Sequence, residues 1–230
     1  GVTLRQDLQS RSGIADGLMP AFKEDAREVL QTSTAQDALT KYATGALANP
    51  PGSKWSYDLV NWIVVQAVLE EVTGESISAV LRNEVLVPAQ MTQSRVFVGA
   101  IGEGAQPPAQ TGLPIPAFLT CAGGLATTPS DLIALARFAH KGGLSEQSLQ
   151  ALQEVATPEE DYALGGRFIE RATDDPRKLS WQSGSNGAYK SLVTYDPVTD
   201  TGFAAMTATG NNDDIQQARA QWLKGLAKTD

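Results

Sequence analysis

The stretch from Tyr57 to Val72 constrains the fold most, because its apolar residues leave almost no polar side on a helix. These residues are Leu59, Val60, Trp62, Ile63, Val64, Val65, Val68, Leu69 and Val72. A helix that is hydrophobic all round lies inside a protein, whereas a surface helix has one apolar stripe. The sequence therefore predicts a central helix that other elements surround, with Gly74 as its left-handed C-cap.

Further helices are predicted on either side of a long loop. Ser76 is placed to cap a second helix that runs through Val85. Residues 99–120 are rich in Gly, Pro and Gln, a composition typical of a surface loop. Thr128 is expected to cap a helix that ends at a Gly-Gly pair, and Ser145 a shorter helix after it.

The pattern changes after Asp161, where short runs rich in aromatic and β-branched residues begin. They predict antiparallel strands over residues 162–171, 178–183, 189–196 and 202–209. An amphipathic helix over residues 213–227 is expected to cover this sheet. The predicted fold class is thus α+β, with a mainly helical region at 1–160 and strands plus a terminal helix at 161–230, together forming one domain.

Charge and residue usage exclude several function classes. The chain of 230 residues has a formal net charge of −8, which argues against a nucleic-acid partner and against anionic membranes. No apolar run reaches the length of a membrane span. The single cysteine and the single histidine, Cys121 and His140, exclude an internal disulfide, a cysteine-based metal site and a Ser-His-Asp triad. We expect no metal and no cofactor.

Two short features have simple structural interpretations. Asp58 is expected to stabilise the first turn of the central helix rather than act as a general base. Gly123 and Gly124 are expected to permit close backbone packing, because nothing around them suggests a phosphate loop.

Five short motifs occur in one order along the chain. Residues 2–13 resemble "TLRQLLSHTSG", and residues 50–57 read Pro-Pro-Gly-Ser-Lys-Trp-Ser-Tyr before the central helix. Residues 88–92 resemble "PLGM", residues 121–125 resemble "AGGL", and residues 162–165 read Tyr-Ala-Leu-Gly. This order is similar to that of the serine β-lactamase-like family, which includes class C β-lactamases, penicillin-binding DD-peptidases and related esterases.

The resemblance implies a site built from three motifs. Tyr57 takes the place of the family's tyrosine, a candidate general base or acid, although its ring could instead belong to the core. Gln182, Ser183 and Gly184 take the place of the substrate-binding motif on an edge strand. Ser185 would supply an oxyanion-hole N–H. Trp181, beside this motif, is a further candidate for ligand contact.

This sequence departs from the family pattern at three points. Leu59 occupies the place of an asparagine, and Gln182 that of a lysine or histidine. The Ser-x-x-Lys nucleophile motif is absent, since no lysine has a serine three residues before it. Because the family carries that motif upstream and the chain starts at Gly1 without Met, we expect a fold incomplete at its N-terminus, without its first strands.

Two functions follow from the resemblance. In the first, the chain is part of a serine hydrolase that cleaves amides or esters through an acyl-enzyme, and is inactive alone. In the second, it is a non-catalytic relative that binds a peptide, a cell-wall-type ligand or a partner protein. A periplasmic or secreted location is implied by the family alone. The apolar strand at 202–209 is expected to end the sheet and to pair with a second copy or with an N-terminal fragment.

Overall fold

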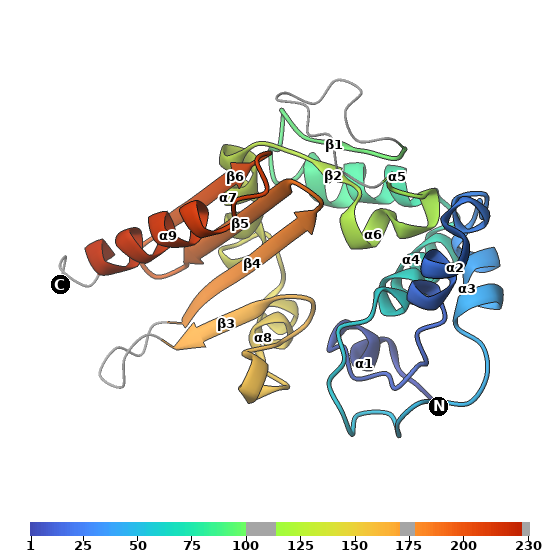
Figure 1. The fold of residues 1–230 in the computed structure, drawn as a ribbon. Helices are drawn as coiled ribbons and strands as arrows, with labels where there is room; N and C mark the ends of the chain where they lie inside the picture. Colours follow the sequence, from blue (N-terminus) through green and yellow to red (C-terminus); the bar gives the residue numbers. More distant parts are fainter. Residues whose placement is uncertain (100–113, 171–177, 227–230) are drawn as a thin grey trace.

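The computed structural model describes residues 1–99, 114–170 and 178–226 (Figure 1). Its elements form a helical block and a four-stranded sheet with helices on both faces. The helical block contains α1 (Leu4–Leu8), α2 (Leu18–Leu30), α3 (Ala35–Tyr42), α4 (Leu59–Thr73), α5 (Ile77–Leu81) and α6 (Thr120–Gly123). The predicted α+β class is confirmed.

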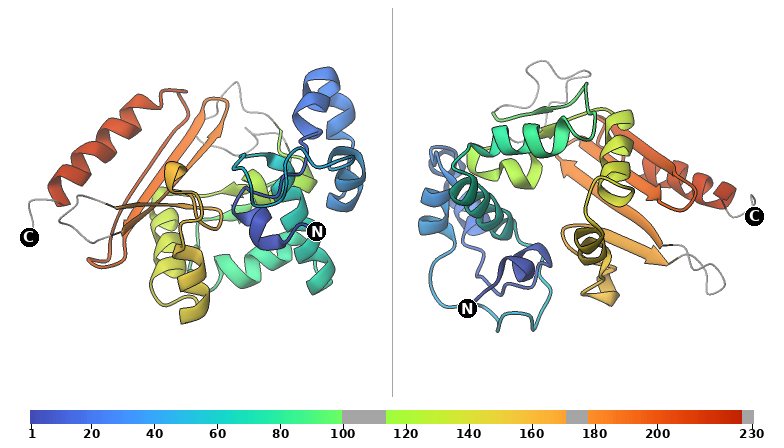
Figure 2. Two further views of the ribbon diagram at one scale, coloured as in Figure 1. Left: turned by 90° about the horizontal axis from the view of Figure 1, so that it is seen from below. Right: turned by 180° about the vertical axis from the view of Figure 1, so that it is seen from behind.

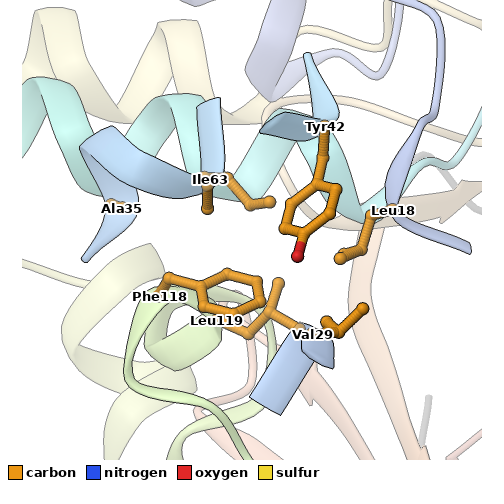
Figure 3. Close-up of a cluster of buried hydrophobic side chains, with 8 residues drawn as sticks. Leu18, Val29, Ala35, Tyr42, Ile63, Phe118 and Leu119 are labelled. Carbon is orange, nitrogen blue, oxygen red and sulfur yellow. The ribbon is translucent and has the colours of Figure 1, made fainter. Parts of the chain in front are cut away.

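Helix α4 is the central helix that the sequence predicts. It contacts α1, α3, α5 and α6, and it ends at Gly74, whose φ of 68° is left-handed. Ile63 of α4 is fully buried in a cluster with side chains from α2, α3 and the segment before α6 (Figure 3). The labelled members of this cluster are Leu18, Val29, Ala35, Tyr42, Ile63, Phe118 and Leu119.

The segment after α4 differs in part from the prediction. Ser76 caps α5 by accepting a hydrogen bond from the backbone N–H of Ala79, as expected. The chain then continues as a π-helix, Arg82–Leu86, rather than as one α-helix through Val85. A π-helical turn is rare and has no strong sequence signal.

The predicted surface loop is wrong at its C-terminal end. Residues 100–113 lie outside the described residues, but residues 117–119 form a 3₁₀ helix that leads into α6. Phe118 is fully buried and Leu119 is 7% exposed, so this segment belongs to the core. The Gly-Gly pair that follows serves close packing at Gly124, where a Cβ would lie 2.8 Å from the backbone of Thr120.

The sheet has the order β3-β4-β5-β6, and every neighbouring pair is antiparallel. Its strands are β3 (Arg167–Glu170), β4 (Lys178–Asn186), β5 (Tyr189–Asp196) and β6 (Thr201–Thr207). The meander prediction is therefore confirmed, although β3 is shorter and β4 longer than expected. A second sheet that the sequence did not reveal pairs β1 (Arg95–Val96) with β2 (Leu125–Ala126).

Helices cover both faces of the four-stranded sheet (Figure 2). Helix α9 (Asp213–Leu226) contacts β5 and β6 on one face, where Trp222 lies against Phe203 at 6.0 Å between ring centroids. Helix α7 (Pro129–His140) contacts the same strands on the other face, and α8 (Glu146–Gln153) lies on that side too. Helices α7 and α8 precede residue 160 in sequence but accompany the sheet in space.

The helix caps predicted around α7 and α8 are present. Thr128 accepts a hydrogen bond from the Asp131 N–H, and Ser145 accepts one from the Ser148 N–H. His140, the last residue of α7, stacks edge-on against Phe168 at 5.1 Å, and burial lowers its pKa to about 4. In the described residues, no helix is both long enough and apolar enough to cross a bilayer.

Candidate functional site

The segment before α4 places Tyr57 beside a second tyrosine. Trp55 and Tyr57 both contact the ring of Tyr162 edge-on, with centroid distances of 5.6 and 6.2 Å. Tyr57 is 44% exposed, whereas Tyr162 is fully buried. Tyr57 is therefore supported by an aromatic contact but is not a core residue, so its phenol remains accessible.

The Tyr162 ring contacts Tyr57 on one side and Arg167, the first residue of β3, on another. The Arg167 guanidinium lies 5.1 Å from the centroid of the Tyr162 ring, a cation–π distance. Burial raises the pKa of the Tyr162 phenol, while the Ser10 side chain and the Arg167 charge partly oppose this effect. Arg167 also donates a hydrogen bond of 3.5 Å to Oε1 of Gln182.

The predicted strand motif lies at a free edge of the sheet. Strand β3 pairs only with residues 178–181 of β4, so in the described chain the segment from Gln182 to Ser185 pairs with β5 alone. Backbone groups at such an edge are free to bind a ligand. Within this segment Ser183, Gly184 and Ser185 are exposed, and Ser185 Oγ accepts a hydrogen bond of 2.6 Å from Lys190 Nζ.

Gly165 connects the helical block to this edge through its backbone. Its N–H donates to the carbonyl of Leu8 at 2.8 Å, and its carbonyl accepts a hydrogen bond from Nε2 of Gln182. Its φ is 73°, and a Cβ would lie 2.9 Å from the ring of Trp62. A glycine is required here because any side chain would meet both strain and a clash.

The indole of Trp181 makes cation–π contacts with two arginines. The guanidinium carbons of Arg167 and Arg219 lie 5.0 and 4.9 Å from the centroid of its indole. Arg219 comes from α9 and also donates a hydrogen bond of 2.8 Å to Oγ1 of Thr194, the residue opposite Trp181 on β5. Trp181 therefore joins α9 to the strand that carries Gln182.

The two residues that follow Tyr57 in the sequence belong to the start of α4. Leu59, at the asparagine position, packs against the core cluster of the helical block. Asp58 is the N-cap residue of α4, so its charge lies at the first turn as expected, although its side chain makes no capping hydrogen bond.

The structure thus connects Tyr57 with Gln182 through Tyr162 and Arg167. Arg167 is the residue that sequence reasoning missed, because a lone arginine at the start of a short strand carries no motif. No salt bridge involves Arg167 in the described part of the chain. Within the same residues, no group of three or more His, Cys, Asp or Glu side chains is placed to hold a metal.

A helical block beside a four-stranded antiparallel sheet is the arrangement of β-lactamase-like domains. The Beta-lactamase family model matches residues 1–226, and the chain belongs to this family.

Solved structures support the same fold. A D-stereospecific amidohydrolase from Streptomyces sp. has a TM-score of 0.77 at 19% identity, over 94% of this chain and 72% of that one. A penicillin-binding protein from Bacillus halodurans has a TM-score of 0.75 at 20% identity, over 96% of this chain and 72% of that one. An octameric penicillin-binding-protein homologue from Pyrococcus abyssi has a TM-score of 0.70 at 21% identity, over 97% and 56%.

Proposed function

We propose that these residues form the substrate-binding part of a β-lactamase-like hydrolase that cleaves an amide or ester. The contact series from Tyr57 through Tyr162 and Arg167 to Gln182 carries this proposal. Tyr57 is the group that would move a proton to or from the leaving group, and its exposed phenol suits that task. Ser185 would offer its N–H to the developing oxyanion. These 230 residues contain no Ser-x-x-Lys motif, which would carry the nucleophile.

Arg167 would supply the positive charge that Gln182 lacks. Its guanidinium lies beside the first residue of the strand motif and has no carboxylate partner in the described residues. Arginine is well suited to bind a carboxylate through two parallel hydrogen bonds. The ligand is therefore expected to be an extended peptide-like amide with a carboxylate near the scissile bond.

A binding protein without catalysis is the second candidate. Leu59 favours it, because an apolar side chain occupies the place of an amide that would hold the substrate. Gln182 favours it too, because its side chain is engaged with Gly165 and Arg167. Both candidates use the same ligand edge on β4.

Ligand binding tests the shared part of the proposal. An N-acetyl dipeptide with a free carboxylate should bind the chain at least about fivefold more tightly than the same dipeptide with a C-terminal amide, because one charge-assisted hydrogen bond is lost in the amide. Arg167→Gln should abolish this preference in calorimetry. Arg27→Gln changes an exposed arginine far from β4 and should leave it intact. Equal affinities for the two peptides in the unmodified chain would contradict the role of Arg167.

A further inference from the structure

A small polar cavity lies next to the segment that carries Tyr57, but on its other side. Its volume is about 280 Å³. Lys54, Ser56 and Asp58 line it, whereas the intervening residues Trp55 and Tyr57 contact Tyr162. Side chains therefore alternate along this segment, and the cavity is separate from the site described above.

Backbone hydrogen bonds hold the walls of this cavity in place. The opposite wall comes from residues 10–16, and the N–H of Ser56 donates to the carbonyl of Ser10 at 2.8 Å. The N–H of Ala48 donates to the carbonyl of Gly13 at 2.8 Å. Ser12, which is 2% exposed, donates a hydrogen bond of 2.5 Å to Oδ1 of the buried Asn61. Hydrogen bonds within the protein therefore fix the walls of the cavity.

Two opposite charges line the cavity, the exposed Lys54 and the partly buried Asp58. Within the described chain, no hydrogen bond or ion pair engages Lys54 Nζ or the carboxylate of Asp58. Asp58 is the more telling of the two, because an aspartate at an N-cap ordinarily bonds to its own helix. The third charged residue of the lining, Asp16, is already engaged, since its Oδ1 accepts from the N–H groups of Leu18 and Met19.

These charges and the cavity volume define the ligand. One free ammonium group and one free carboxylate are complementary to a molecule with one carboxylate and one ammonium group. The hydroxyl group of Ser56 adds a donor and an acceptor to the lining. A cavity of about 280 Å³ is large enough for a small molecule.

We propose that this cavity binds the zwitterion of a small amino acid. Lys54 binds its carboxylate, and Asp58 binds its ammonium group. Because Lys54, Ser56 and Asp58 alternate with Trp55 and Tyr57, occupancy of the cavity fixes the segment that supports the Tyr57 ring. The site is a second one and does not require that the chain be an enzyme.

An NMR titration with alanine tests this site. The Trp55 Nε1–H is buried without a partner in the described residues, so its indole signal reports changes in this segment. Alanine should shift that signal with saturation, and alaninamide and propionate, which each carry one charge only, should bind about tenfold or more weakly. Lys54→Met and Asp58→Asn should each weaken alanine binding about tenfold. Lys23→Met and Glu24→Gln, matched changes at exposed positions outside the cavity, should have no effect.

Three outcomes would overturn the proposal. The first is the absence of a saturable shift with alanine up to about 50 mM, a concentration that covers very weak binding. The second is an equal response to propionate or to glycerol, which would indicate a site for anions or for polyols. The third is a loss of binding in Lys23→Met as large as that in Lys54→Met. The dipeptide assay of the β4 edge is independent of all three.

Discussion

Asp7 on α1 illustrates how one buried charge affects the whole chain. It is 3% exposed, and its Oδ1 has no hydrogen-bond partner in the described residues. Burial raises the pKa of this carboxyl to about 7. The folded chain therefore binds the carboxyl proton of Asp7 more tightly than the unfolded chain does. The stability that this difference contributes is fully present below about pH 4, where Asp7 is neutral in both states, and it is lost as the pH rises through 7.

Asp7→Asn removes this ionisation while keeping the shape of the side chain. The free energy of unfolding at pH 8 should rise by about 1–3 kcal/mol, and the difference from the unmodified chain should vanish near pH 4. Urea unfolding at several pH values measures both. The matched control Glu24→Gln, at an exposed position, should be neutral throughout. A constant effect of Asp7→Asn at all pH values would indicate a packing change instead.

Single residues were predictable from sequence where the cause is local. Ser76, Thr128 and Ser145 cap their helices as expected, because a cap depends on a few neighbouring residues. That Asp58 also lines a cavity was not predictable, because a distant loop forms the opposite wall. Asp131 is buried and accepts hydrogen bonds from the N–H of Gln93 and the hydroxyl of Ser94, contacts that no local pattern reveals.

Strand β6 is an edge strand of the sheet, and helices α7 and α9 pack on its two faces. Only β5 pairs with it in the described chain, as the sequence predicted, and Phe203 to Met206 contain no charge or proline. Met206 is 40% exposed. On one face of the sheet, Trp222 of α9 lies against Phe203 of β6. Such an edge promotes pairing between chains.

We therefore expect the β6 edge to be occupied in solution. Amide exchange at residues 203–207 should be slow at high protein concentration and faster on dilution, whereas β5 amides should not depend on concentration. Met206→Lys should make β6 exchange fast, because a lysine on an edge opposes pairing. Val198→Lys, at an exposed turn position, is the control. Fast exchange in a monomer at every concentration would show that the edge is tolerated.

Helices and strands were predictable from sequence where the spacing of apolar residues follows a single helical or strand pattern. Strand β5 coincides with the predicted range, and α4 starts two residues after the predicted start, because the apolar patterns there are continuous. The extension of β4 to Asn186 was missed, because residues 184–186 are small and polar. The strands β1 and β2 have two residues each, too few for a sequence pattern, and they pair across 29 and 31 positions of the chain.

At the scale of the molecule, the absent Ser-x-x-Lys motif has a direct consequence. These 230 residues alone should form no acyl-enzyme with a penicillin, a cephalosporin or a nitrophenyl ester, because no serine has a lysine one turn later to lower the cost of removing its proton. Intact-mass spectrometry after incubation measures this. A stoichiometric adduct on any serine, retained in Tyr57→Phe, would contradict both the missing nucleophile and the role of the tyrosine.

The candidate site was predictable only as a set of motifs. Family order placed Tyr57 and Gln182 in one site, and the contacts through Tyr162 and Arg167 are consistent with this. From the family order we also predict that Tyr57 and the segment from Gln182 to Ser185 face one another across a single groove. The arrangement of Arg167 and Arg219 over Trp181 could not be predicted, since the three residues are brought together by strand pairing and by the packing of α9.

The position of Arg219 over Trp181 also sets an order in time during synthesis. Arg219 follows Trp181 by 38 residues in the sequence. At the usual speed of a ribosome, the indole waits roughly two to eight seconds for this guanidinium to be made. During that interval β4 lacks its contact with α9, whereas strands β5 and β6 have already been synthesised. A nascent chain stalled before α9 would therefore expose the sheet face to chaperones, and the ligand edge would mature last.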